Sequence, residues 1–447
     1  MPPFAMKRRF LISLLALTSL FSDAATLRIE GGRARLSADN DTLAEILRLF
    51  ERCGVDVRLD PALASKRISG SWNDVETDRL VAQLAAPHNY LLEWKRITGP
   101  LGNFDRPASI RIFSGNRPER ARPLSNRRKT LDVVEGTNGI QRIRGEILVS
   151  FRRDAHRADL ETLLDRLGGT IVEVIDPPGL YRIRIRNGLS EDEARIIARK
   201  SPGVGRSELN EVFRRPEEAP VSASPELSAA LPPNLSIHPG AGAAVAVLDS
   251  GFDPRYANLP FIKGTYDAVD PEAPIDDPSG HGTLTTLVAA GAVTPLGSEP
   301  ADRAVPVVSV RVFDENGMTS SDVLLRALRY AADSGAQIVN MSWSSDRDLP
   351  FMREIMDYAA HNGMTLVAAA GNEPTGRPIY PAAYDSVLAV GGLAPDGSRW
   401  KNSNFGDFVP IYRPAIARFD GRFYAGTSIS APREAHELAA GKSATKR

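Results

Sequence analysis

The segment Ala244-Val245-Ala246-Val247-Leu248-Asp249-Ser250-Gly251 carries the clearest structural signal in this chain of 447 residues. Its apolar run is continuous rather than alternating, which is typical of a parallel strand buried on both faces of a sheet. A second such run, residues 365–370, precedes Asn372, and helix-like segments at 283–290 and 323–332 lie between the two runs. Because buried strands alternate with helices, the sequence predicts a doubly wound, mostly parallel α/β sheet whose ligands bind beyond the carboxyl ends of the strands.

Reactive groups stand at the expected boundaries of these elements. Asp249 ends the first strand, His281 lies in Ser-Gly-His-Gly-Thr, and Ser428 lies in Gly-Thr-Ser-Ile-Ser-Ala-Pro. A neutral imidazole can take the proton of a serine hydroxyl, and a buried carboxylate can fix the imidazole tautomer. Asn372 offers an amide donor for the oxyanion that such an attack creates. Each residue alone has an ordinary alternative as a cap or turn residue, but the four together predict a serine nucleophile.

These segments resemble those of the subtilisin-like serine peptidases over roughly residues 240–432. Asp249 matches the acid of the family's Asp-Ser/Thr-Gly motif, His281 the base of His-Gly-Thr, and Ser428 the nucleophile of Gly-Thr-Ser-x-x-x-Pro. Asn372 matches the oxyanion donor. The resemblance implies a catalytic domain at 240–440 that hydrolyses peptide bonds through an acyl-enzyme intermediate and requires no cofactor.

Two further segments resemble the substrate cleft of that family. Residues 339–344 are similar to the strand that pairs with a bound peptide, and residues 379–382 are similar to a pocket-lining loop. The residues that we expect to contact substrate are Ser342, Trp343, Ser344, Gly371 and Tyr380. Ser344 stands where the family often has glycine, and Trp343 would add bulk to the cleft. Trp343 and Tyr380 would favour peptides with large apolar side chains.

The segment after Pro432 departs from the family pattern, in which a small, apolar, buried helix usually follows. Residues 433–440 are amphipathic instead, and the apolar residues that share one face are Ala431, Ala435, Leu438 and Ala439. We therefore expect the other face of this helix to meet solvent or a partner, and the support behind Ser428 to be thinner.

The first 24 residues have the features of an export signal. Met6–Arg9 is basic, Phe10–Phe21 is largely apolar, and Ser22–Ala24 offers small residues before a cut. The apolar core is short for a membrane span, although an uncleaved anchor is the alternative. We expect a periplasmic or secreted protein. The only cysteine, Cys53, excludes an intramolecular disulfide, and we expect it to pack in the core.

Residues 26–114 form a predicted first mature domain. Its first helix has apolar residues at helical spacing, namely Leu43, Ile46, Leu47 and Phe50, with Asn40 or Asp41 as the expected cap. The order of segments 27–29, 42–47 and 68–72 resembles the short N-terminal domain of secretins and TonB receptors. That likeness implies an α+β interaction domain with an envelope or outer-membrane partner; a spacer without a partner is the alternative.

Residues 115–140 are basic but lack interleaved aromatic residues, so we expect a solvated linker rather than a nucleic-acid-binding arm. The whole chain has 55 basic and 55 acidic residues, so no overall field favours nucleic acid as a partner. Asp270, Asp276 and Asp277 could donate oxygen to calcium, but their spacing fits no defined loop. We expect no metal site, and the six histidines show no metal-ligand spacing.

Residues 141–215 predict the order β-α-β-β-α-β of a ferredoxin-like domain, with a capping box at 190–193. This domain resembles the inhibitory propeptide of the subtilisin-like peptidases. The resemblance implies an intramolecular chaperone whose tail lies in the active cleft until it is cut; an ordinary ferredoxin-like module is the alternative. Residues 216–239 are rich in proline and should stay extended. We expect self-cleavage there or just upstream, around 212–215.

A second function of a different class is compatible with these features. The chain could be a non-catalytic envelope adaptor or pseudopeptidase, in which the first domain docks to an outer-membrane assembly and the peptidase fold only binds peptide. The altered segment after Pro432 favours this alternative. The presence of Asp249, His281, Asn372 and Ser428 together opposes it.

Overall fold

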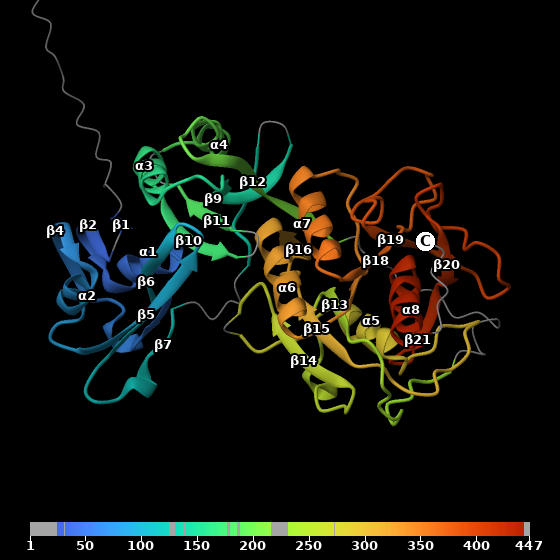
Figure 1. The fold of residues 1–447 in the computed structure, drawn as a ribbon. Helices are drawn as coiled ribbons and strands as arrows, with labels where there is room; N and C mark the ends of the chain where they lie inside the picture. The colour runs from blue at the N-terminus through green and yellow to red at the C-terminus, as the bar shows by residue number, and fades with distance from the viewer. Residues whose placement is uncertain are drawn as a thin grey trace, which may run out of the picture. The chain divides into compact units, whose positions relative to one another are not determined.

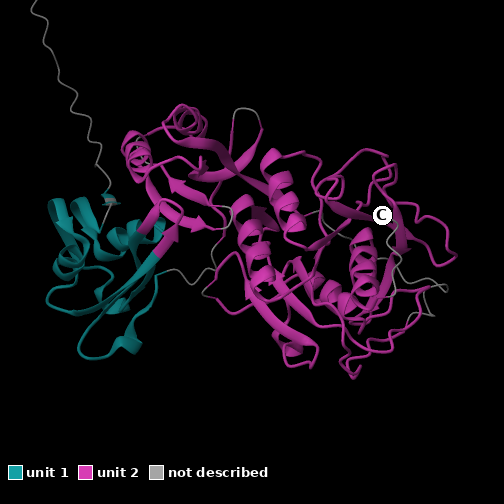
Figure 2. Cartoon of the chain, viewed as in Figure 1, with its two compact units in different colours: residues 1–96, 104–124 teal, residues 97–103, 125–447 magenta. Residues whose placement is uncertain are grey.

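The computed structural model describes residues 25–441 apart from Gly31, 125–129, 137–138, 177–178, 186–187, 216–230 and Glu272. The chain divides into two compact units, coloured separately in Figure 2. One unit contains the residues up to Arg96 together with Phe104–Leu124, and the other contains Ile97–Asn103 and the residues from Ser125 onward. The predicted export signal lies outside the described residues. Within the described part, no helix has the length and apolar character needed to cross a membrane.

The first unit is the predicted small α+β domain. Its three-stranded antiparallel sheet consists of β1 (Thr26–Glu30), β2 (Arg33–Thr42) and β4 (Arg67–Glu76). Its second sheet, in the order β5-β6-β3-β7, consists of β5 (Asn89–Gly99), β6 (Gly102–Phe113), β3 (Asp56–Leu59) and β7 (Arg122–Pro123). The helices α1 (Leu43–Arg52) and α2 (Thr77–Ala85) complete the unit.

Helix α1 shows how the sequence pattern produces this core. The predicted apolar face is fully buried, and Cys53 packs against it as expected. The cap differs from the prediction, because Thr42 rather than Asn40 or Asp41 accepts a hydrogen bond from the Glu45 amide. Glu45 accepts one from the Thr42 amide at 2.7 Å in return, which completes a capping box.

The second unit begins with an antiparallel sheet in the order β10-β11-β9-β12, with β8 paired to β9. Its elements are β8 (Val133–Glu135), β9 (Gln141–Phe151), α3 (Arg157–Leu167), β10 (Thr170–Ile175), β11 (Leu180–Arg184), α4 (Glu191–Arg199) and β12 (Val204–Arg214). From β9 to β12 this is the predicted β-α-β-β-α-β order. Helix α4 begins at the predicted capping box, where Ser190 and Glu193 bond each other reciprocally.

A seven-stranded parallel sheet follows in the order β14-β15-β13-β17-β18-β19-β20 (Figure 1). Its strands are β13 (Val245–Asp249), β14 (Ile262–Asp267), β15 (Val307–Arg311), β17 (Ile338–Met341), β18 (Thr365–Ala369), β19 (Val387–Leu393) and β20 (Ile411–Pro414). The four helices are α5 (His281–Ala290), α6 (Ser321–Asp333), α7 (Pro350–His361) and α8 (Thr427–Ala439). A hairpin of β21 (Ile416–Phe419) and β22 (Arg422–Ala425) precedes α8. The predicted doubly wound fold is confirmed.

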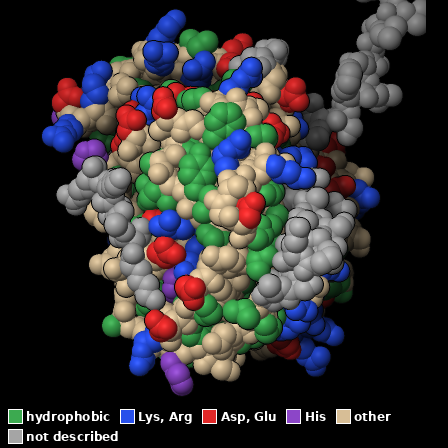
Figure 3. Space-filling view, turned by 90° about the vertical axis from the view of Figure 1, so that its right-hand side faces the viewer, with side chains coloured by type: hydrophobic (Ala, Val, Ile, Leu, Met, Phe, Trp, Pro, Cys, Tyr) green, Lys and Arg blue, Asp and Glu red, His purple; other side chains and the backbone are tan. Residues whose placement is uncertain are grey.

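Both faces of this sheet are covered, as the continuous apolar run of β13 predicts. Ala246 and Leu248 pack in a core cluster with residues of α6 and α7. Val245 and Val247 pack in a separate cluster with residues of α5 and α8. On the face seen in Figure 3, basic and acidic side chains are interspersed around apolar ones, in keeping with the balanced composition.

Helix α8 corrects one prediction. We expected its polar face to meet solvent or a partner, but Arg433, Glu434 and His436 are all buried, and Glu434 is 0% exposed. Arg413 on β20 contacts Glu434 at 2.6 Å and Glu437 at 3.0 Å. A polar helix can thus be buried because an arginine from a neighbouring strand compensates its carboxylates.

Candidate active site

The acid of the site ends β13, a central strand between β15 and β17. Asp249 is 1% exposed. Its Oδ1 accepts a hydrogen bond from the Ser250 amide at 2.7 Å and lies 2.6 Å from Nδ1 of His281. Its Oδ2 accepts from Oγ1 of Thr285 at 3.1 Å. The carboxylate is thus held at both oxygens, and the ring of His281 is oriented by Nδ1.

The charge of Asp249 follows from these neighbours. Burial alone raises the pKa of its carboxyl group. The charge of the His281 ring, the hydrogen bond to that ring and the more distant charge of Arg215 outweigh burial and hold the pKa of Asp249 below its usual value. The group is therefore ionised at neutral pH, as an acid that orients an imidazole must be.

His281, the candidate base, is the first residue of α5. The preceding Gly280 has a left-handed φ of 74°. The turn is fixed by Asp277, whose carboxylate accepts from the hydroxyl of Ser250 at 2.8 Å and from the amide and hydroxyl of Thr283 at 2.7 Å each. A side chain at Gly282 would collide with the backbone of Gly251. The His-Gly-Thr motif thus reflects a close approach of α5 to the end of β13.

The nucleophile candidate is the second residue of α8. Ser428 is 2% exposed, and its hydroxyl has no hydrogen-bond partner among the described residues. Its backbone carbonyl accepts from the hydroxyl of Ser342 at 3.0 Å, and Ser342 accepts from Nδ2 of Asn340 at 2.9 Å. Helices α5 and α8 pack against each other, and His436 and the Ala289 carbonyl are 3.1 Å apart across that contact.

The amide of Asn372 is locked against the start of α8. Its Oδ1 accepts from the Thr427 amide at 2.9 Å and from the Thr427 hydroxyl at 3.0 Å. The amide of Gly371 donates to the same hydroxyl at 3.0 Å. Because both bonds use the oxygen of Asn372, its nitrogen is the end that can donate to a ligand at the start of α8.

Among the predicted substrate contacts, Ser342 and Trp343 are buried and Ser344 is half-buried. The ring of Trp343 packs edge-on against Phe313 at 6.2 Å, within the core beside α6 and α7. Its side chain therefore belongs to the core and offers no exposed wall to a substrate. Trp343 was predicted to add bulk to the substrate cleft, but its side chain is buried in the core. The sequence cannot distinguish the two positions, because an apolar residue after a strand can point to either side of the sheet.

Tyr380 is half-buried, and its ring lies 4.8 Å from that of Tyr384. Its backbone exchanges hydrogen bonds of 2.7 and 2.8 Å with Ser345, so the predicted pocket loop is joined to the segment that follows β17. Gly371 has a φ of 97°, and a side chain there would collide with Ile379. The contact of these residues with substrate stays a prediction.

Two supporting residues escaped the sequence analysis. Thr285 lies four residues after His281, and this helical spacing could have signalled that both face Asp249. Asp277 was considered as a calcium ligand, but its carboxylate is used within the turn described above. Asp276 contacts the buried Arg311 at 3.3 Å. Within the described residues, no group of three or more His, Cys, Asp or Glu could hold a metal ion.

The last strand of the antiparallel sheet extends to the parallel-sheet domain. Strand β12 leaves β9 and pairs antiparallel with β16 (Met318–Ser320), so that Val212 faces Ser320 and Phe213 faces Thr319. The amide of Arg215 continues the ladder by donating to the Gly317 carbonyl at 2.8 Å. The charge of Arg215, after that of His281, also helps to hold the pKa of Asp249 below its usual value.

Comparison with known proteins identifies the family of the chain. A model of the subtilase family matches residues 240–446, and a model of the fervidolysin N-terminal prodomain matches residues 128–210. The thermophilic serine proteinase of Bacillus sp. (strain AK1) is 28% identical over 326 residues, which are 65% of this chain and 76% of that protein. Thermitase of Thermoactinomyces vulgaris is 30% identical over 210 residues, which are 45% of this chain and 75% of thermitase.

The crystal structure of fervidolysin from Fervidobacterium pennivorans, described as a keratinolytic enzyme related to subtilisin, matches with a TM-score of 0.51 and 20% identity. The match covers 68% of this chain but only 55% of fervidolysin, so it supports the fold alone. The family of the chain is shown by its 30% identity to thermitase, of which 75% is covered, together with the match to the subtilase family model. The chain therefore belongs to the subtilase family of serine endopeptidases and carries a prodomain ahead of its catalytic domain.

Proposed function

We propose that this chain is an exported serine endopeptidase, made as a zymogen, in which Asp249, His281 and Ser428 form the catalytic triad. Ser428 attacks a peptide carbonyl through Oγ while His281 accepts the hydroxyl proton. Asp249 holds the Nδ1–H of the resulting imidazolium, and the Asn372 amide with the Ser428 backbone N–H binds the oxyanion. His281 then gives the proton to the leaving amine, and a water molecule hydrolyses the acyl-enzyme by the same steps in reverse order.

One observation carries this proposal. A fully buried, ionised carboxylate lies 2.6 Å from Nδ1 of His281, the geometry needed to orient a general base. The unbonded hydroxyl of Ser428 at a helix N-terminus is the group that such a base would serve, because the helix dipole favours the negative charge that develops there. A purely structural role would not require an ionised acid of this kind beside the imidazole.

The zymogen proposal rests on the pairing of β12 with β16. Three residue pairs and the bond from Arg215 to Gly317 hold the end of the prodomain on an edge of the catalytic domain, close enough for Arg215 to influence Asp249. A bound peptide would compete for the same edge. We propose that residues 141–215 inhibit the enzyme until a bond downstream of this strand is cut, and that they assist its folding.

Export and recognition complete the proposal. The features of residues 1–24 support secretion or a periplasmic location, and the predicted secretin-like domain at 26–114 would bind an envelope partner. For substrates we propose peptides with large apolar residues, with the half-buried Tyr380 lining the pocket.

A fluorophosphonate probe, which labels an activated serine, tests the mechanism. We expect the matured protein to be labelled at Ser428 and the Ser428→Ala protein to remain an uncut, unlabelled precursor. Ser430→Ala is the matched control, because Ser430 is buried on the same helix and its hydroxyl bonds the Arg413 carbonyl at 2.9 Å. Folded parent protein that takes no label and migrates like Ser428→Ala would favour the non-catalytic adaptor instead.

A further inference from the structure

Strand β12 pairs first with β9 and then with β16. Leu209 faces Ile147 and Glu211 faces Arg142 on β9, and from Val212 the strand pairs with β16. The ladder with β9 is irregular between Leu209 and Glu211, which is the position of Asn210. Such irregular points bend a strand and release the register on one side from that on the other. Beyond Glu211, β12 has no further pair with β9 among the described residues, so its last residues can shift along β16 while the earlier part of the strand stays in place.

The pairing with β16 is too short to specify its own register. It comprises three residue pairs and the single bond from Arg215 to Gly317. A slip by one residue would turn the buried Val212 and Phe213 to the opposite faces, which is costly. A slip by two residues would keep each side chain on its face, so the ladder discriminates weakly against it. Side-chain contacts must supply the missing discrimination: Arg347 contacts Glu211 at 3.1 Å, and Asn210 makes a buried contact of its own.

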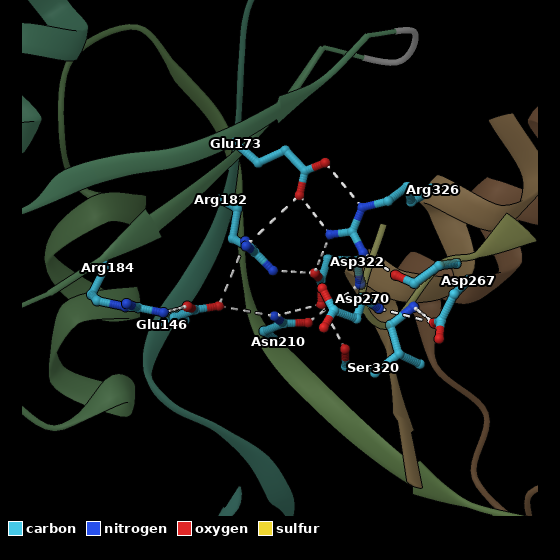
Figure 4. Close-up of polar contacts among 12 residues, drawn as sticks. Glu146, Glu173, Arg182, Arg184, Asn210, Asp267, Asp270, Ser320, Asp322 and Arg326 are labelled. Atoms are coloured by element: carbon cyan, nitrogen blue, oxygen red, sulfur yellow. Dashed lines mark hydrogen bonds and ion pairs between the residues drawn. The ribbon is translucent and has the colours of Figure 1, made fainter. Parts of the chain in front are cut away.

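Asn210 makes that contact with the catalytic domain (Figure 4). It is 0% exposed, and its Nδ2 donates to Oδ1 of Asp322 at 2.9 Å. The amide of Asp322 points back to Oδ1 of Asn210 at 3.4 Å. Asp322 lies only two residues after Ser320, the last residue of β16. A hydrogen bond from Asn210 to Asp322 therefore restricts the position of β12 along β16.

Asp322 is itself immobilised from several sides, as Figure 4 shows. The hydroxyl of Ser320 donates to it at 2.6 Å, Arg326 contacts it at 3.0 Å, and Arg182 of the prodomain forms an ion pair with it. Burial raises the pKa of Asp322, but these two arginines outweigh burial and hold the pKa well below its usual value. The acceptor of the Asn210 hydrogen bond is thus a carboxylate oxygen that is held in place from several sides and is charged at neutral pH.

The rest of the prodomain sheet is anchored on the same helix. Glu173 on β10 accepts two hydrogen bonds from Arg326 on α6, at 3.0 and 2.6 Å. These bonds hold the sheet as a body, whereas Asn210, which also donates to Glu146 of β9 at 3.3 Å, lies close to the residues that pair with β16. Loss of the Asn210 contact should therefore change the register of β12 on β16 without releasing the prodomain sheet from α6.

We propose that the Asn210–Asp322 pair fixes the register of β12 on β16 and so selects the peptide bond that is presented to Ser428 during self-cleavage. This inference rests on the proposed function, since it concerns the choice of bond in the same reaction. A hydrogen bond to a charged group changes an equilibrium by about tenfold or more. Its loss should therefore allow a second register, two residues away, to become detectable.

The experiment is to determine the N-terminus of the matured enzyme by mass spectrometry. We expect one terminus for the parent protein and an additional one, displaced by two residues, for Asn210→Leu, which keeps the branched shape of the side chain. Asn210→Ser is measured too, in case the leucine precursor does not fold by circular dichroism. Ser207→Ala is the matched control, because Ser207 is buried on the same strand and its hydroxyl has no partner among the described residues. An unchanged single terminus in a folded Asn210 variant overturns the inference.

A second readout does not require catalysis. Arg214 faces Met318 across the ladder, so cysteines at both positions should form a disulfide. In a Ser428→Ala, Cys53→Ser background we expect this crosslink to form readily and to fall severalfold when Asn210→Leu is added. If the parent enzyme takes no fluorophosphonate label, the proposed function fails, and the crosslink alone decides the register. If the label is taken but the crosslink is unaffected, only the register inference fails.

Discussion

Replacing Thr285 by valine tests whether the second oxygen of the acid matters to catalysis. Among the described residues, Oδ1 of Asp249 has two donors, whereas Oδ2 has only the hydroxyl of Thr285. Thr285 is 0% exposed, so valine would fill the same space with no water to replace the hydroxyl. The carboxylate would then be free to rotate about its remaining bonds, and the ring of His281 would be less well aligned.

The size of the effect follows from the geometry of this bond. A hydrogen bond to a charged group contributes about 1.5–3 kcal/mol. The bond here is 3.1 Å long, and the same hydroxyl also lies 3.1 Å from the Gly282 carbonyl, so the lower end of that range applies. About 1.5 kcal/mol of transition-state stabilisation corresponds to a roughly tenfold loss of kcat/KM. The loss should fall mainly on kcat, because Thr285 does not touch substrate.

Steady-state kinetics on matured enzyme measure this effect. Thr285→Ser retains the hydroxyl and should restore most of the activity. Thr286→Val is the matched control, because Thr286 is equally buried on the same helix but bonds Ser309 at 3.1 Å rather than Asp249. Full activity of Thr285→Val, or an equal loss in Thr286→Val, would refute the role assigned to Thr285.

Three further outcomes can be measured. Asn372→Ala should lower kcat by about 10²–10³, the loss typical of subtilisin when its own oxyanion donor is removed, while KM changes little. Arg326→Gln should lower the free energy of unfolding of the Ser428→Ala precursor by about 3 kcal/mol at pH 7. Because the pKa of Glu173 and that of Asp322 lie below their usual values of 4.5 and 3.8, this difference should persist above pH 4.5 and fade only as the pH falls through the lowered values; a difference that is independent of pH contradicts it. Glu434→Ala should cost about 3 kcal/mol in thermal unfolding, since it leaves Arg413 with Glu437 alone, and a loss below 1 kcal/mol would show that Glu437 compensates.

The candidate catalytic residues are recognisable in the sequence because their signals are local. The continuous apolar run of β13 predicts a doubly buried parallel strand, and the acid that follows must then lie at the edge where such sheets bind ligands. The capping box at Ser190 and Glu193 predicts where α4 begins, since both partners lie within one helical turn. Patterns of this kind depend on a few neighbouring residues, so the strand and the helix start can be predicted from the sequence.

The surroundings of those residues depended on partners that are distant along the chain. Helix α8 was predicted to expose its polar face, but Arg413 from β20 neutralises Glu434 and the helix is buried. The buried bond between β12 and α6 could not be foreseen either, since Asn210 and its partner Asp322 are 112 residues apart. The sequence by itself determined the fold class and the candidate triad, because apolar periodicity and short motifs act over a few residues. Tertiary structure alone decided which charges are buried and which strand edges meet, because those outcomes depend on the neighbours that folding brings together.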